Sequence, residues 1–246
     1  MTQANLDPRP RIVGLDLARS IAVIGMVVFH FTFDLELFGY VAPGTTFQPF
    51  WYYFARLVAG SFLFLSGVGL WLAHGRGIRW AAFWRRFAMV AGAAALVSVA
   101  SIWVTPWGVI YFGILHALAA SSLIGLLFLR LPALATLAVA ALAFALPWFA
   151  QRPEFQGVWL LWLGLADIRP PMADYVPLLP WLAPCLAGVA LAKLATRAQL
   201  WPHLSAKPSP RLQALAFPGR HSLIIYLVHQ PLLIACFTAY AWLKQG

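Results

Sequence analysis

Long apolar stretches, separated by short polar ones, run along the whole chain. A transmembrane helix needs about 20 mainly apolar residues to cross a hydrocarbon core about 30 Å thick, and several stretches reach that length. They cover residues 13–33, 50–73, 87–104, 108–129, 132–150, 178–195 and 221–243. This pattern predicts an all-α fold, a polytopic transmembrane helix bundle. Because no internal repeat and no long loop interrupts it, residues 1–246 are expected to form a single domain.

The composition supports a membrane protein. The chain is 62% hydrophobic and 10% charged, whereas a soluble domain is typically about 45–50% apolar and about 25% charged. The first apolar run is too long for the core of a cleavable signal peptide and carries Arg19 and His30, so it is interpreted as the first span. Cys185 and Cys236 lie in apolar runs, which is typical of packing residues.

The basic charge indicates topology. A formal net charge of +10 would suggest a nucleic-acid partner in a soluble protein, but we find no nucleic-acid motif and expect no such partner. In membrane proteins, Lys and Arg gather in cytoplasmic loops. With a cytoplasmic N-terminus, the outside segments hold three basic residues: Arg152, Arg169 and Lys244. The inside segments hold twelve: Arg9, Arg11, Arg76, Arg79, Arg85, Arg86, Arg130, Lys193, Arg197, Lys207, Arg211 and Arg220. The C-terminus is then expected outside.

Ionisable side chains within a membrane span are costly and mark function by default. In the first run, Asp16 and Arg19 are one helical turn apart and are expected to pair. Arg19 and His30 share a face, about 16 Å apart along the helix. Asp34 follows His30 by four residues, so its carboxylate is expected to fix the imidazole tautomer and raise its basicity. The alternative is a packing histidine that hydrogen-bonds a neighbouring helix.

Three further polar residues in the apolar runs extend this candidate site. His116, in "YFGILHALAASSL", is either an interhelical hydrogen-bonding residue or a wall of the site. His229 lies in the last run, close to a proline that is expected to kink the helix. Arg56 either snorkels to the surface, offsets Asp34 or binds an anionic group. We assign His116, His229 and Arg56 to the substrate pocket.

Two acidic residues near the ends of apolar runs are harder to interpret. Asp174 precedes the sixth run and fits a loop or helix-cap role better than a catalytic one, but it is also assigned to the pocket. Glu36 is expected to point away from His30, toward water or headgroups. The chain has no nucleophile elbow, P-loop or HExxH motif. Histidine is therefore the best-supported acid/base group, and no metal ion is expected.

The opening "RIVGLDLARSIAVIGMVVFHFTFDLELFG" resembles the heparan-α-glucosaminide N-acetyltransferase catalytic-domain family, particularly its short bacterial members. Further matches follow in order: "FLFLSGVGLWLA", "YFGILHALAASSL", "DYVPLLPWLAPCLAG" and "GRHSLIIYLVHQPLL". Together they cover nearly the whole chain. Arg19 and His30, with ten residues between them, are also similar to the Arg/His pair of the wider integral-membrane acyltransferase superfamily.

The resemblance implies transmembrane acyl transfer. Acetyl-CoA would bind as co-substrate from the cytoplasm, and its acetyl group would pass to an amino sugar or surface glycan beyond the lipid bilayer. The family acceptor is the amine of a terminal glucosamine. The resemblance also implies a bacterial inner-membrane protein, and it leaves a homo-oligomer open. The lysosomal enzyme carries its proposed active-site histidine in the loop after the first span. The corresponding "GYVAPGTTFQPF" has none, so that role is given to His30.

In this hypothesis, His30 oriented by Asp34 removes a proton from the acceptor amine or hydroxyl, and the acceptor attacks the thioester. Binding of the CoA phosphates requires basic residues at the cytoplasmic entrance of the site. The expected donor-binding residues are Arg19, Arg76, Arg79, Arg85, Arg86 and Arg220.

Two other classes stay open. The first is a haem- or quinone-binding redox protein that uses histidine ligands. Depth along the helices separates His30, near the outer face, from His116 and His229 nearer the middle, so the latter two are the candidate pair. The second is a small-solute transporter, although the inverted repeats common in transporters are not seen.

Overall fold

The computed structural model describes residues 12–104, 108–170, 172, 174–204 and 209–245. Within these ranges, seven helices of 13 or more residues correspond to the seven apolar runs. They are α1 (Val13–Leu37), α2 (Pro49–His74), α3 (Trp80–Val104), α4 (Ile114–Phe128), α5 (Ala133–Ala145), α7 (Leu178–Arg197) and α11 (Ser222–Gln245). Shorter elements join them: η1 (Thr45–Phe47), α6 (Pro147–Ala150), η2 (Pro153–Gln156), η3 (Leu161–Leu163), α8 (Trp201–Leu204), α9 (Pro210–Leu215) and α10 (Phe217–Arg220).

The predicted all-α polytopic bundle is confirmed. Within the described ranges, five helices are long and apolar enough to cross a membrane, namely α1, α2, α3, α7 and α11. The fourth and fifth runs form shorter apolar helices than predicted. The fourth begins at Ile114, after Gly113 in an extended conformation. The fifth ends before Pro147, which has no backbone N–H and is the first residue of the separate short helix α6. Of the charges used to predict orientation, Arg9, Arg11 and Lys207 lie outside the described residues.

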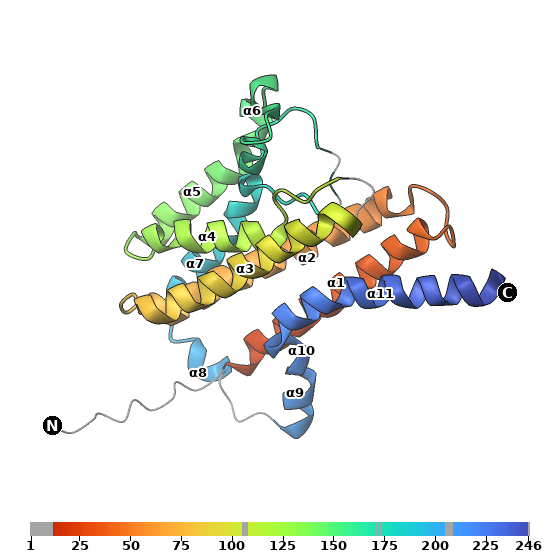
Figure 1. Cartoon of the computed structure of the whole chain (residues 1–246). Coiled ribbons are helices and arrows are strands. Elements are labelled where there is room, and N and C mark those ends of the chain that lie inside the picture. The colour runs from red at the N-terminus through yellow and green to blue at the C-terminus, as the bar shows by residue number, and fades with distance from the viewer. Residues whose placement is uncertain (1–11, 105–107, 171, 173, 205–208, 246) are drawn as a thin grey trace.

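Helix α7 is the centre of the packing. It contacts α2, α4 and α5, while α1 contacts α2, α10 and α11 (Figure 1). The α2–α7 crossing is close because each helix offers a glycine to the other backbone. A Cβ on Gly67 would overlap the carbonyl oxygen of Cys185, and a Cβ on Gly188 would overlap that of Phe64. Small residues at membrane helix crossings allow such an approach.

Lys193 is a structural residue of the core, although the orientation count treated it as a loop charge. It lies in α7 with only 4% of its surface exposed. Its Nζ donates to the carbonyl oxygens of Phe128 and Leu131 at the end of α4, and lies 3.4 Å from Thr136 Oγ1. A cation at a helix C-terminus satisfies carbonyls that lack intrahelical partners, so Lys193 fixes α4 against α5 and α7.

The expectation that Glu36 points toward water or headgroups was wrong. Its carboxylate accepts hydrogen bonds from Gly44 N at 2.6 Å, Thr46 N at 2.8 Å and Thr46 Oγ1 at 2.7 Å. The chain turns back after α1 through Gly39 and Gly44, which both have positive φ, and the turn brings these donors onto Glu36. The residue therefore shapes the α1–α2 connection.

Candidate active site

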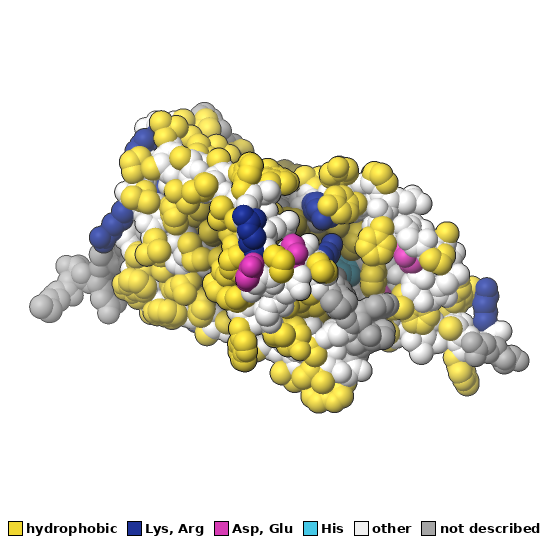
Figure 2. Space-filling view, turned by 90° about the horizontal axis from the view of Figure 1, so that it is seen from above, with side chains coloured by type: hydrophobic (Ala, Val, Ile, Leu, Met, Phe, Trp, Pro, Cys, Tyr) yellow, Lys and Arg dark blue, Asp and Glu magenta, His cyan; other side chains and the backbone are white. Residues whose placement is uncertain are grey.

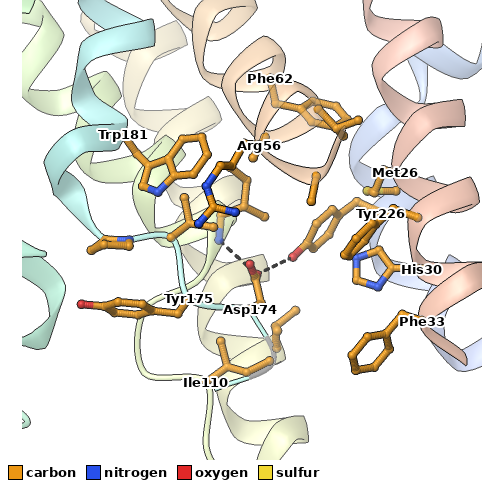
Figure 3. A pocket seen from close by; sticks show the side chains of 18 of the residues that line it. Met26, His30, Phe33, Arg56, Phe62, Ile110, Asp174, Tyr175, Trp181 and Tyr226 are labelled. Atoms are coloured by element: carbon orange, nitrogen blue, oxygen red, sulfur yellow. Dashed lines mark hydrogen bonds between the residues drawn. The ribbon is translucent and has the colours of Figure 1, made fainter. Parts of the chain in front are cut away.

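A cavity of about 950 Å³ lies between α1, α2, α3, α7, α11 and the loop before α7. Aromatic side chains form much of its wall, including Phe29, Phe33, Phe62 and Trp181. Polar residues enter from several elements, so that His30, Arg56, Asp174 and Tyr226 face the same space (Figure 3). Figure 2 shows basic and acidic side chains around a hollow with a histidine in its depth, on a face that is otherwise largely hydrophobic.

Two histidines meet at this cavity. The imidazole centroids of His30 and His229 are 4.9 Å apart in an edge-to-face arrangement, and both residues line the cavity. The depth argument, which paired His229 with His116, was wrong, because α11 packs along α1 and brings His229 to His30. Two imidazoles in direct ring contact cannot lie on opposite faces of one haem, so this pair does not have the arrangement of two axial ligands.

The tautomer of His229 follows from its contacts. Its Nδ1 lies 2.6 Å from the carbonyl oxygen of Tyr226. A carbonyl only accepts, so Nδ1 carries the proton and Nε2 of the neutral ring has a free lone pair. His229 is 7% exposed, and its Nε2 has no hydrogen-bond partner among the described residues. The ring thus offers an unprotonated nitrogen, held in place by its own helix.

Asp34 does not orient His30. The carboxylate Oδ1 accepts a hydrogen bond from Gln230 Nε2 at 2.7 Å, across the α1–α11 interface. In the part of the chain that the structure describes, no hydrogen bond joins Asp34 to His30, and His30 Nδ1 is buried without a partner. A shared helical face was correctly predicted, but the amide on the facing helix takes the carboxylate.

Asp174 connects three elements. Its Oδ2 accepts from Ile114 N at 3.0 Å, at the start of α4, and from Tyr226 Oη at 3.1 Å (Figure 3). The predicted helix-cap role is therefore seen, although the capped helix lies 60 residues away in sequence. Burial raises the pKa of the Asp174 carboxyl above its usual range, while the two hydrogen bonds and Arg169 oppose that shift. The residue also lines the cavity.

Two arginines enter the cavity where α1 ends and α2 begins. Arg56 of α2 donates from Nη1 to the Tyr52 carbonyl at 3.2 Å and lies over the Tyr52 ring. Arg169 comes from the loop before α7 and is exposed. The suggestion that Arg56 offsets Asp34 was wrong, because Asp34 is bound to Gln230.

His116 lies outside the set of residues that line the cavity. Its Nδ1 accepts from Gly113 N at 3.2 Å, and its Nε2 lies 3.3 Å from Ser98 Oγ. These contacts stabilise the start of α4 against α3. Of the two interpretations open for His116, the interhelical hydrogen bond is the one that the structure has.

A basic cluster, defined as Arg19, Arg86 and Arg220, lies toward the other end of the bundle. Arg19 Nη1 pairs with Asp16 Oδ1 at 2.9 Å, as predicted, and Arg220 Nε lies 3.5 Å from Asp16 Oδ2. Arg86 reaches Ser66 Oγ at 3.4 Å and interacts electrostatically with Arg19. Helices α1 and α10 thus bring two guanidiniums to one carboxylate, and α3 adds a third guanidinium near Arg19.

The remaining predicted donor residues lie on the surface near the α2–α3 connection. Arg76, Arg79 and Arg85 are exposed, and the Arg79 guanidinium donates from Nε to the Ala73 carbonyl at 3.2 Å. They lie toward the same end of the bundle as the basic cluster, and in the part of the chain that the structure describes they form no ion pair with Asp16.

Sequence reasoning left several polar or aromatic residues of the cavity unassigned, among them Arg169, Trp181, Tyr226 and Gln230. One signal was present for the last two, because polar residues at positions 226, 229 and 230 share part of one helix in an apolar run. Arg169 and Trp181 carry no comparable signal, since loops and interfacial segments of membrane proteins are rich in both residue types.

Comparison with known proteins identifies the family. The sequence model of the family described as "Heparan-alpha-glucosaminide N-acetyltransferase, catalytic" matches residues 11–231. The chain belongs to this family. The resemblance seen in the sequence is thereby confirmed, and the chain is a membrane acetyltransferase by family. No significant match was found among curated proteins or solved structures.

Proposed function

We propose that this protein transfers the acetyl group of cytoplasmic acetyl-CoA to an amine or hydroxyl of an amino sugar or surface glycan on the far side of a bacterial inner membrane. The observation that carries the proposal is the imidazole pair of His30 and His229 in a large cavity of a chain that belongs to an acetyltransferase family. The N-terminus is cytoplasmic in this proposal.

The donor side is supported by the basic cluster. Arg19 and Arg220 share the carboxylate of Asp16, and Arg86 adds a third guanidinium close enough to repel Arg19 electrostatically, so positive charge remains for the phosphates of CoA. Arg19 and His30 are eleven residues apart on α1, a rise of about 16 Å. A CoA molecule whose phosphates bind the cluster would therefore extend its thioester along α1 toward the imidazole pair.

His229 Nε2 is the proton acceptor in this mechanism. It takes the proton from the acceptor N–H or O–H, and the freed lone pair attacks the thioester carbonyl. The new N–C or O–C bond forms, the C–S bond breaks, and the CoA thiolate takes the proton from the imidazolium. General base catalysis of this kind supplies about 10²–10⁴-fold. His30, in ring contact with His229, contacts the reacting groups from α1.

The proposal is tested with purified protein in detergent, acetyl-CoA and glucosamine. Release of CoA thiol and formation of N-acetylglucosamine are measured for the wild type and for His229→Ala and His30→Ala. The matched control is His221→Ala, because His221 is exposed between α10 and α11 and its Nδ1 contacts the Phe217 carbonyl at 3.0 Å. We expect both cavity variants to lose transfer and the control to keep it. Full activity in His30→Ala would remove His30 from the mechanism.

A further inference from the structure

Helix α11 carries the proposed base but lies at the edge of the bundle. Among the residues of α11 whose exposure is described, only His229 and Phe237 are buried, and the helix packs mainly along α1. A helix with so few buried residues can tilt or turn unless polar contacts hold it. Because a displacement of 1 Å can cost about 10²-fold in rate, the contacts that hold His229 in place bear directly on the chemistry.

Two side-chain hydrogen bonds join α11 to other elements on either side of His229. Gln230 Nε2 donates to Asp34 Oδ1 on α1 at 2.7 Å. Tyr226 Oη donates to Asp174 Oδ2, in the loop before α7, at 3.1 Å (Figure 3). Tyr226 and Gln230 are four residues apart, so both bonds and the histidine between them lie within about one helical turn. This turn of α11 is therefore bound to α1 on one side and to the loop on the other.

Backbone contacts hold the Asp174 end of the second bond. The same Oδ2 accepts from Ile114 N at 3.0 Å, and Val176 N donates to the Phe112 carbonyl at 3.2 Å. The loop is thus bound at two points to the start of α4 and the segment before it. A Cβ on Gly113 would overlap Oδ2, so the carboxylate lies directly against that glycine. The carboxylate therefore has little room to move.

Tyr226 connects this carboxylate to the base. Its carbonyl oxygen lies 2.6 Å from His229 Nδ1, and the centroids of the two rings are 5.7 Å apart. We propose that Asp174 and Tyr226 are positioning residues, whose hydrogen bond holds the His229 ring beside His30 with Nε2 free to take the acceptor proton. A carboxylate that only caps α4 needs no tyrosine from α11. This inference rests on the proposed function.

Acetyl transfer from acetyl-CoA to glucosamine is measured for two conservative variants of the purified protein. Tyr226→Phe removes one hydroxyl and leaves both the ring and the cap of Asp174 on Ile114. We expect its kcat to fall about 10- to 100-fold, with KM for both substrates unchanged. Asp174→Asn keeps a carbonyl oxygen with two lone pairs for the same two donors, so its kcat should stay within about threefold of the wild type. A loss in Asp174→Asn as large as in Tyr226→Phe would give the role to the carboxylate charge and overturn the positioning role.

The His229→Ala background separates positioning from a general effect on stability. A residue that acts through His229 has nothing to position once the imidazole is gone. Adding Tyr226→Phe to His229→Ala should therefore leave the residual rate unchanged, because groups that act as a unit are not additive. A residue that only stabilises the fold would lower the rate by the same factor in both backgrounds, and that result would overturn the proposal.

NMR of protein labelled with 15N-histidine gives a second measurement, with the His229 signals assigned from His229→Ala. The wild type should show the Nδ1–H tautomer that the Tyr226 carbonyl requires. In Tyr226→Phe the His229 signals are expected to shift toward a mixture of the two tautomers. Unchanged signals would overturn the proposal, whatever the residual rate of the double variant.

The matched control is Tyr240→Phe. Tyr240 is an exposed tyrosine of the same helix, its ring lies 5.8 Å from that of Tyr40, and it lies outside the set of residues that line the cavity. Its variant should leave kcat, KM and the His229 signals unchanged. If Tyr226→Phe instead raised KM for glucosamine and kept kcat, the hydroxyl would be a substrate contact, and the positioning role would be overturned.

The outcomes distinguish this inference from the proposed function. If the wild type transfers acetyl, His229→Ala loses transfer and Tyr226→Phe keeps full kcat, the positioning role falls and the acetyltransferase with its base stays. If His229→Ala keeps full activity, His229 is not the base, and the positioning role falls with it. Absence of transfer in the wild type would overturn both the proposed function and this inference.

Discussion

Gln230 of α11 donates a hydrogen bond from Nε2 to Oδ1 of Asp34 on α1 at 2.7 Å. Asp34 is fully buried, at 0% exposure, and its Oδ2 has no hydrogen-bond partner among the described residues. The bond therefore gives a hydrogen-bond partner to one oxygen of a carboxylate that is shielded from water. Since His229 precedes Gln230, the same contact also sets how α11 presents its imidazole to His30.

Removing that donor should destabilise the protein. Gln230→Leu leaves both oxygens of Asp34 buried and unsatisfied, at a cost of about 1–3 kcal/mol or more for a charged group. We expect a lower midpoint of thermal unfolding in detergent. Asp34→Asn keeps an acceptor oxygen for Gln230 and should lose less. If Asp34→Asn instead abolished transfer with unchanged stability and unchanged acetyl-CoA binding, the carboxylate charge would act on His30 after all.

The imidazole pair should behave as one unit. His30→Ala and His229→Ala are each expected to lower kcat about 10²–10⁴-fold, the usual range for a general base. The double variant should lose about as much as the worse single variant, because groups that act together in one step are not additive. Single-turnover rates at saturating acetyl-CoA measure this. Losses that multiply in the double variant would mean that the two residues act in separate steps.

The sequence predicted the helices well because the length of each apolar run determines where a membrane-spanning helix can form. Helices α1, α2 and α7 begin and end within a few residues of the predicted runs. Three helices differ from their runs: α3 begins earlier, at Trp80, α4 begins later, at Ile114, and α5 ends at Ala145, before Pro147. The hydropathy pattern does not predict how the helices pack. Figure 1 shows this packing, with α7 lying among α2, α4 and α5.

The site was predicted only in part, since pairing between helices depends on their packing. The ionisable residues of the first run were correctly singled out, and Asp16 does pair with Arg19 within one helical turn. Asp34 was given to His30 because the two share a face of α1, but the facing helix supplies Gln230. A periodic pattern tells which face of a helix a polar residue occupies and not which partner reaches it.

The basic cluster should control the affinity for acetyl-CoA. Arg19→Gln and Arg86→Gln each remove a cation that faces the proposed phosphate site, so KM for acetyl-CoA is expected to rise about tenfold, equivalent to about 1.4 kcal/mol. The rise in the wild-type KM with added salt should be weaker in the variants, because fewer charges remain to be screened.

Arg130→Gln is the matched control for this cluster. Arg130 is an exposed arginine in the α4–α5 turn, so its loss changes the net charge by the same amount without touching the cluster. Its KM should stay near the wild-type value. An equal rise in KM for Arg130→Gln would mean that overall charge, and not the cluster, attracts the donor.

The glycine crossing of α2 and α7 should be intolerant of a single methyl group. In Gly67→Ala and Gly188→Ala, the new Cβ meets the backbone carbonyl of the facing helix, and backbone cannot move aside as a flexible side chain does. Overpacking of this kind typically costs about 1–3 kcal/mol, more than the gain of about 1 kcal/mol from replacing glycine in a helix. Gly92→Ala in α3 has nothing within 4 Å of its Cβ, so it should be neutral or stabilising. Thermal unfolding of the three variants in detergent measures the difference, and wild-type stability of Gly67→Ala would show that the two helices do not cross this closely.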